Sequence, residues 1–164
     1  MTSPEETTAG SETPLADQEL KQALRNMLQI ELEAMQFYQQ ASRFLQDEGA
    51  IYHFDQLAQE ELEHARIFYA VYPDTDLPDL AQLVQELPQQ ITRLNVVDQH
   101  LVARMTEHQA LQLAIKLEKA TADNLQKILE QVQSPAARAA IEQNIESTLG
   151  HLALIEQDYQ RLFR

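Results

Sequence analysis

The sequence predicts an all-α protein built as a four-helix bundle, and two observations support this fold class. The chain has 164 residues with three Gly and six Pro, and it is dominated by Ala, Leu, Gln and Glu, which lose least on entering a helix. Apolar residues recur at helical spacing over four long segments. The length and the 44% hydrophobic content suit one folded domain with a substantial core.

The formal net charge of -14 and the lack of cysteine exclude several functions. A chain this acidic is repelled by nucleic acid and by anionic lipid, so we expect small cations as partners and neither nucleic acid nor membrane. Without cysteine there is no disulfide, thiolate metal site or iron–sulfur cluster, and a bound metal must use oxygen and nitrogen. The sequence has no signal-peptide pattern and no run of eighteen apolar residues, so we expect a cytoplasmic protein.

We expect residues 1–13 to form a disordered acidic tail and residues 14–164 to form one domain. Within the domain, a helical hairpin over 14–72 and a second hairpin over 106–164 are joined by a crossover over 73–105. This connection is too long for a tight helical turn and suits a segment that runs along the outside of a bundle.

In the first hairpin, either Thr13 with Pro14 or Asp17 can cap the first helix. We expect this helix to continue until the turn that Gly49 marks. The second helix should stop before Pro73, because a residue that precedes proline disfavours the helical conformation.

The crossover contains a predicted short helix over 79–87 and a further helical piece over 89–105. The second hairpin begins at Thr106, which opens a capping box, and Ser134 followed by Pro135 ends one helix and starts the next. The short turns make both hairpins antiparallel.

The first candidates for chemistry are Glu61 and His64, which lie three residues apart and share one face of a helix. An offset of 87 residues aligns Glu31 with Glu118 and His64 with His151, and each of these Glu precedes its His by 33 residues. Residues equally far from a hairpin turn lie near each other, so these four should converge at one depth, with Glu61 as a fifth. Buried carboxylates are costly unless they are paired or metal-bound, which predicts a metal site.

Three stretches then resemble a known family. They are residues 31–38, in which an aromatic pair follows Glu31, residues 57–65 around Glu61 and His64, and residues 110–118, which end at Glu118. Their order resembles the ferritin-like di-iron carboxylate proteins and, within them, the rubrerythrin-like branch. The rubredoxin module of that branch needs four cysteines and is lacking.

The resemblance implies a ferritin-like bundle that binds two metal ions through Glu31, Glu61, His64, Glu118 and His151. Glu31 and His64 would hold one ion, Glu118 and His151 the other, and Glu61 would bridge them. Iron is the first choice and manganese an alternative, because hard oxygen ligands with imidazole suit both, and zinc is a further alternative because the order of affinities favours it. The resemblance also implies a homodimer.

The chain departs from the family pattern at two positions. Thr148 stands where the family places a second bridging Glu, and Thr121 where rubrerythrins place a further Glu. Three carboxylates leave one positive charge of two divalent ions unbalanced, so the affinity for the second ion should be lower. Glu146 can replace the lost ligand only if a π-bulge changes the register of its helix, whereas Asn144 is a weaker oxygen donor on the correct face.

The resemblance implies an oxidoreductase that acts on peroxide or oxygen and receives electrons from a separate protein. The alternative is a non-catalytic metal-binding or structural member of the fold, because loss of the carboxylate at Thr148 can end turnover. The fold alone does not decide between these functions.

The remaining polar residues have ordinary explanations. We expect Glu60 and Glu63 to point away from the metal face into solvent, and Tyr38 to be either a core tyrosine or a hydrogen-bonding neighbour of the site. Three histidines lack a partnering carboxylate in an apolar stripe and are expected at the surface or in the crossover: His53, His100 and His108.

Overall fold

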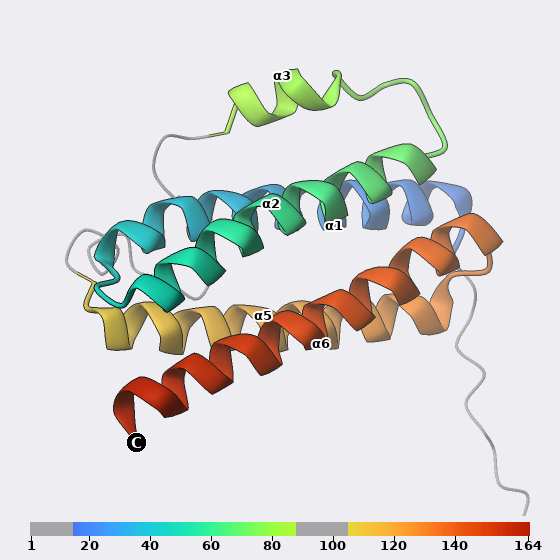
Figure 1. The fold of residues 1–164 in the computed structure, drawn as a ribbon. Coiled ribbons are helices and arrows are strands. Elements are labelled where there is room, and N and C mark those ends of the chain that lie inside the picture. Colours follow the sequence, from blue (N-terminus) through green and yellow to red (C-terminus); the bar gives the residue numbers. More distant parts are fainter. Residues whose placement is uncertain (1–14, 88–104) are drawn as a thin grey trace, which may run out of the picture.

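In a computed structural model, the described residues are 15–87 and 105–164, and within these ranges the chain is helical and contains no strand. Four long helices form the bundle and a short helix lies outside it (Figure 1). The helices are α1 (Asp17–Ala41), α2 (Glu48–Val71), the short α3 (Leu80–Gln85), α5 (Glu107–Gln131) and α6 (Pro135–Phe163). The predicted all-α, ferritin-like fold class is confirmed.

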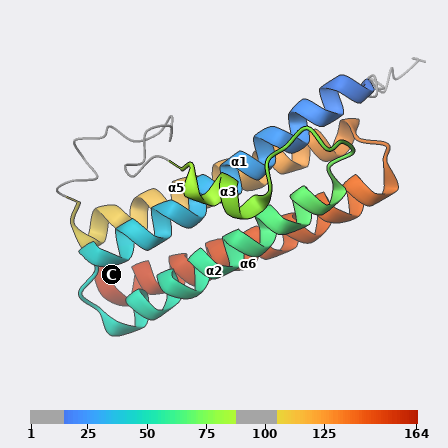
Figure 2. The same cartoon turned by 90° about the horizontal axis from the view of Figure 1, so that it is seen from above.

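The two hairpins pack against each other along their length. Helices α1 and α2 form one hairpin and α5 and α6 the other, while α2 packs against α6 and α1 against α5. Figures 1 and 2 show α3 on the outer side of the α1–α2 hairpin, away from α5 and α6. Among the described helices, none is long and apolar enough to cross a membrane.

The start of α1 differs from the prediction. The residue before the helix is Ala16, whose backbone N–H donates to the Glu19 side chain at 2.9 Å. Asp17 is the first helical residue, where its negative charge suits the positive end of the helix dipole. The other predicted cap, Thr13 with Pro14, lies outside the described residues.

The turn between α1 and α2 also differs in detail. Helix α1 ends at Ala41 and is followed by a short 3₁₀ helix, η1 (Ser42–Phe44), which leads to the buried Leu45. Asp47, and not Gly49, then fixes the start of α2, because its Oδ1 accepts a hydrogen bond from the backbone N–H of Ala50 at 2.8 Å. Gly49 therefore lies in the first helical turn.

The other helix starts follow the prediction more closely. The Asp79 side chain caps α3, Thr106 forms the expected capping box of α5, and Ser134 caps α6 with Pro135 as its first residue. Of the predicted helical piece over 89–105, all but Met105 lies outside the described residues.

The core consists of two apolar clusters, one toward each end of the bundle. One cluster includes Phe37, Phe54, Leu111 and Ile155. The other includes Leu28, Phe68, Leu125 and Ile141. On each long helix, buried polar residues lie in the stretch of chain where one cluster gives way to the other. The fold thus places a polar layer between two apolar ones.

Candidate metal centre

The polar layer contains the five residues that the repeat predicts to converge. Glu31 comes from α1, Glu61 and His64 from α2, Glu118 from α5 and His151 from α6. Each is at most 4% exposed. Because every long helix contributes, the arrangement of the four helices fixes the geometry of the cluster.

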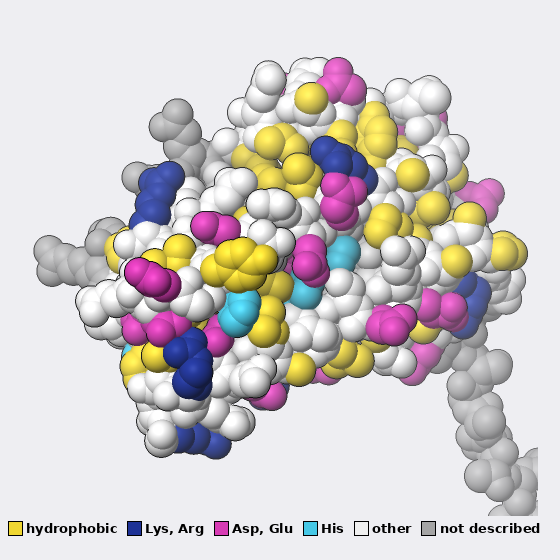
Figure 3. Space-filling view, viewed as in Figure 1, with side chains coloured by type: hydrophobic (Ala, Val, Ile, Leu, Met, Phe, Trp, Pro, Cys, Tyr) yellow, Lys and Arg dark blue, Asp and Glu magenta, His cyan; other side chains and the backbone are white. Residues whose placement is uncertain are grey.

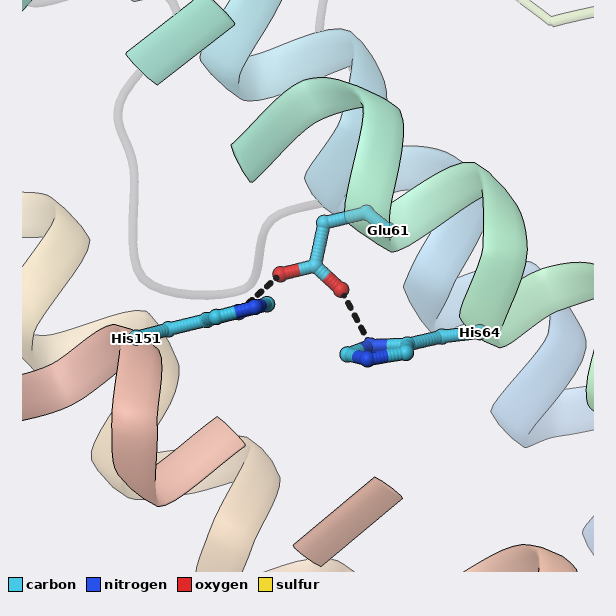
Figure 4. Close-up of side chains that lie close together, drawn as sticks. All are labelled: Glu61, His64 and His151. Carbon is cyan, nitrogen blue, oxygen red and sulfur yellow. Dashed lines mark hydrogen bonds and ion pairs between the residues drawn. The ribbon is translucent and has the colours of Figure 1, made fainter. Parts of the chain in front are cut away.

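The Glu61 carboxylate lies between the two imidazoles (Figure 4). Its Oε2 is 2.8 Å from His64 Nδ1 and its Oε1 is 3.1 Å from His151 Nδ1. One potential ligand atom from each of these three residues lies within 4.8 Å of the other two. Glu61 is therefore positioned between two separate nitrogen donors.

A further carboxylate flanks each imidazole. Glu31 Oε2 is 3.6 Å from His64 Nδ1, and Glu118 Oε2 is 3.8 Å from His151 Nδ1. The two halves of the repeat thus present the same pair of groups to the shared Glu61. The second oxygen of Glu31, Oε1, is buried and has no hydrogen-bond partner among the described residues.

The close packing of acids and bases shifts their pKa values in a consistent way. Burial and the charge of Glu61 raise the pKa of Glu31 to about 8. Burial alone would lower the pKa of each imidazole, but contacts with the carboxylates outweigh it and raise the pKa of His64 to about 9 and of His151 to about 11. Burial would raise the pKa of Glu61, yet hydrogen bonds from both imidazoles lower it. At neutral pH the metal-free cluster balances its carboxylates with bound protons.

Tyr38 is a direct neighbour of the cluster. It is fully buried on α1, and its hydroxyl donates a hydrogen bond to Glu118 Oε1 on α5. Burial, followed by the charge of Glu118, raises the pKa of this hydroxyl well above its usual value. The structure supports both predicted roles, because Tyr38 also belongs to the apolar cluster that includes Phe37 and Phe54.

The α6 face beside His151 carries no further carboxylate. Thr148 and Asn144 are fully buried there, and neither amide atom of Asn144 has a hydrogen-bond partner among the described residues. Glu146 is exposed, and α6 is an uninterrupted α-helix across this region. The idea that Glu146 replaces the lost ligand through a π-bulge is thus wrong.

Thr121, the other position at which the chain departs from the family pattern, is half-buried on α5.

The position of Glu60 differs from the prediction, because its carboxylate contacts the outer ring nitrogen of His151 and does not simply point into solvent. Glu60 Oε2 lies 2.8 Å from His151 Nε2, although 53% of the Glu60 side chain is exposed. The Ser147 hydroxyl lies 3.3 Å from the same nitrogen. Glu63 behaves as expected, since its exposed side chain pairs with Arg66 on the same helix. Figure 3 shows histidine side chains reaching the surface formed by α2 and α6, with acidic side chains beside them.

The other histidines are partly as expected. His53 is half-buried, and its Nδ1 is 2.6 Å from Oδ2 of the buried Asp158, so the expectation that it lacks a carboxylate partner is wrong. That partner belongs to α6, so spacing within one helix gives no sign of it. His108 is half-buried and its Nε2 lies 2.9 Å from the Tyr159 hydroxyl. His100 lies outside the described residues.

The chemistry of this donor set suits divalent metal ions. Three carboxylates and two imidazole nitrogens face one another inside the bundle, and such groups are costly to bury without protons or cations to balance them. The unpartnered Oε1 of Glu31 offers a free lone pair in the same layer. A metal ion would replace the protons that Glu31, His64 and His151 hold at neutral pH because their pKa values are raised.

Comparison with known proteins agrees with this arrangement. The family model described as Rubrerythrin matches residues 22–157, which include all five residues of the cluster. Comparison with the curated proteins gives no match.

Proposed function

The chain belongs to the rubrerythrin family, and from this premise we propose that it is a di-metal carboxylate protein that acts as an oxidoreductase on peroxide or oxygen. The observation that carries the proposal is the position of Glu61. Its two oxygens face two imidazoles, 2.8 and 3.1 Å away, and each imidazole has its own flanking carboxylate. Such a group can bridge two metal ions.

Each half of the repeat would supply one terminal pair of ligands. Glu31 and His64 would hold one ion, Glu118 and His151 the other, and Glu61 would contact both. The Nδ1 atoms of both imidazoles face the carboxylates, so these are the nitrogens available as ligands.

A pair of ferrous ions, when bound, supplies the two electrons that reduce a peroxide. The residues of the chain supply the environment. The two apolar clusters, above and below the polar layer, exclude bulk water from the bundle interior. Tyr38 holds a proton at its hydroxyl oxygen and directs it to Glu118 Oε1, which fixes the orientation of that carboxylate.

Iron is the metal we propose first, with manganese as an alternative, because hard carboxylate oxygens with imidazole suit both, and zinc as a further alternative because of its higher place in the order of affinities. Since the chain has no cysteine, a rubredoxin module is not available within it to deliver electrons. A separate donor protein is therefore part of the proposal. A homodimer and a cytoplasmic location stay predictions.

A second function is favoured by one specific observation. At the position where the family has a second bridging Glu, the chain has the buried, uncharged Thr148, and the buried polar residue one helical turn before it is the neutral Asn144. A non-catalytic metal-binding protein would keep the five ligands and lose turnover with this carboxylate.

Peroxide consumption by the iron-loaded protein separates the two functions. The protein is loaded anaerobically with Fe(II), freed of excess iron and mixed with hydrogen peroxide, and both peroxide and ferrous iron are followed. An oxidoreductase oxidises its iron much faster than free Fe(II), consuming one peroxide for every two ferrous ions. His53→Gln, which alters a histidine outside the cluster, is the matched control and should behave like the wild type. Bound iron that reacts no faster than free Fe(II) would favour the non-catalytic function.

A further inference from the structure

We propose that Glu60 is a positioning residue for the metal centre, which holds the His151 imidazole from the solvent side so that its inner nitrogen faces the metal position. This inference rests on the proposed function and adds a residue outside the five ligands. Its basis is the contact between Glu60 Oε2 and His151 Nε2, at 2.8 Å.

The two ring nitrogens of His151 face different partners. His151 Nδ1 faces inward, 3.1 Å from Glu61 and 3.8 Å from Glu118, and Nε2 faces outward to Glu60. An ionised carboxylate accepts hydrogen bonds and donates none, so Nε2 must carry the proton in this pair. The inner Nδ1 is then the nitrogen that can give up its proton to bind a metal.

Glu60 reaches the ring from a different helix and from the surface. It belongs to α2, whereas His151 belongs to α6, so the contact also spans the interface between the two hairpins. The His151 side chain is 5% exposed and that of Glu60 is 53% exposed. The carboxylate is thus in water at one edge and in contact with a buried ring at the other.

His151 Nε2 has a second polar neighbour, Ser147, at the position that the repeat relates to Glu60. The offset of 87 residues aligns Glu60 with Ser147, and the Ser147 hydroxyl lies 3.3 Å from the same Nε2. Glu60 is the closer of the two and the charged one, and hydrogen bonds to charged acceptors are roughly twice as strong as neutral ones. Ser147 alone would hold the ring less firmly.

A residue that orients a metal-binding imidazole changes metal affinity without touching the metal. Loss of such an outer partner typically lowers metal affinity by about 10–100-fold. The ion held by His151 should therefore bind less tightly when Glu60 is replaced, and the overall fold should be unaffected because about half of the Glu60 side chain is exposed.

The experiment compares Glu60→Ala and Glu60→Gln with Glu63→Ala, a control that removes the same charge from an exposed neighbour on the same helix. The first readout is the ring Nε2–H proton of His151 in the metal-free, ¹⁵N-labelled protein, assigned by its disappearance in His151→Gln. The second readout is a titration with Co²⁺ followed by its optical absorbance.

Wild type and Glu63→Ala should show a downfield, slowly exchanging Nε2–H proton, which Glu60→Ala loses. Cobalt affinity at the weaker position should drop about 10–100-fold in Glu60→Ala, by less in Glu60→Gln, and stay unchanged in Glu63→Ala. Equal affinities in all variants, or equal losses in Glu60→Ala and Glu63→Ala, would overturn the proposal. If the wild type binds no cobalt, the proposed function fails on its own, and the ring proton alone decides whether Glu60 positions His151.

Discussion

The imidazole rings of His64 and His151 stack across the interface between α2 and α6, with centroids 5.2 Å apart and ring planes inclined by 15°. These two residues are related by the 87-residue offset of the sequence repeat. The two hairpins therefore meet with equivalent side chains face to face, as expected for a centre built from two similar halves.

Glu61→Ala should remove the second metal ion more completely than His64→Ala or His151→Ala. Glu61 faces both imidazoles, so its loss affects both proposed positions, whereas each imidazole serves one. Metal content per chain after dialysis against Fe(II) under anaerobic conditions measures the effect, with His53→Ala as a control outside the cluster. Equal losses in the three cluster variants would count against a bridging role for Glu61.

Thr148→Glu should restore the fourth carboxylate. It should destabilise the metal-free protein and strengthen the binding of the second metal ion. In the metal-free form, a carboxylate at this fully buried position should lower the Tm, because burying an unpaired charge is costly. In the metal-loaded form it should raise the affinity for the second ion by roughly tenfold or more, since ligand charge strengthens binding.

Thermal unfolding with and without metal, together with a metal titration, tests Thr148→Glu. The neutral variant Thr148→Gln is the control, because glutamine has the size of glutamate and adds no charge. An unchanged affinity for the second ion in Thr148→Glu would show that position 148 does not reach the metal.

The metal-free protein should lose stability as the pH rises above about 6.5. The pKa values of His64 and His151 are raised from 6.5 to about 9 and about 11, so the folded chain holds these protons more tightly than the unfolded chain. This stabilisation is complete below pH 6.5 and is lost as the pH rises through the folded-state values. Glu31, with its pKa raised from 4.5 to about 8, acts in the same direction over a lower range.

Tm measured from pH 6 to 10 checks this pH dependence. The metal-free Tm should fall by several degrees over that range, and saturating metal should flatten the curve because the ions replace the protons. The double variant His64→Gln/His151→Gln should show a smaller fall. A metal-free Tm that is constant over this range would contradict the assigned proton balance.

Asn144→Leu should stabilise the metal-free protein. Both amide atoms of Asn144 are buried without a partner among the described residues, and the neighbouring cluster includes the apolar Leu125 and Ile141. A leucine of similar size removes an unsatisfied polar group, for a gain of about 1–3 kcal/mol in the free energy of unfolding. Denaturant unfolding measures the change, and Asn26→Leu, at a position whose side chain pairs within its own helix, is the comparison. A loss of stability would mean that the amide of Asn144 has a structural role.

The helices and the convergence of five polar residues could be predicted from the sequence for a clear physical reason. Hairpin geometry relates residues by their distance from a turn, so Glu31 pairs with His64 and Glu118 with His151 once the turns are located. The repeat then places both pairs at one depth. Two of the helix starts, at Thr106 and Ser134, could be predicted for a different reason, because a helix cap depends only on residues near it in the sequence.

Contacts between the hairpins could not be predicted in this way. The pairing of Glu60 with His151 and of His53 with Asp158 depends on how α2 is rotated against α6, which no spacing within one helix determines. The prediction that Glu60 points into solvent used the Glu61–His64 face alone. That prediction did not consider α6, whose packing against α2 brings the outer ring nitrogen of His151 next to Glu60.

The number of ions bound per chain is the decisive measurement for the proposed di-metal site of Glu31, Glu61, His64, Glu118 and His151. The full chain is loaded anaerobically with Fe(II), dialysed, and analysed for iron and protein. We expect close to two ions per wild-type chain when the dialysis buffer holds saturating Fe(II), and fewer in Glu61→Ala. Less than about 0.2 ions per wild-type chain would contradict the proposed site, because a buried set of five such ligands should retain metal through dialysis.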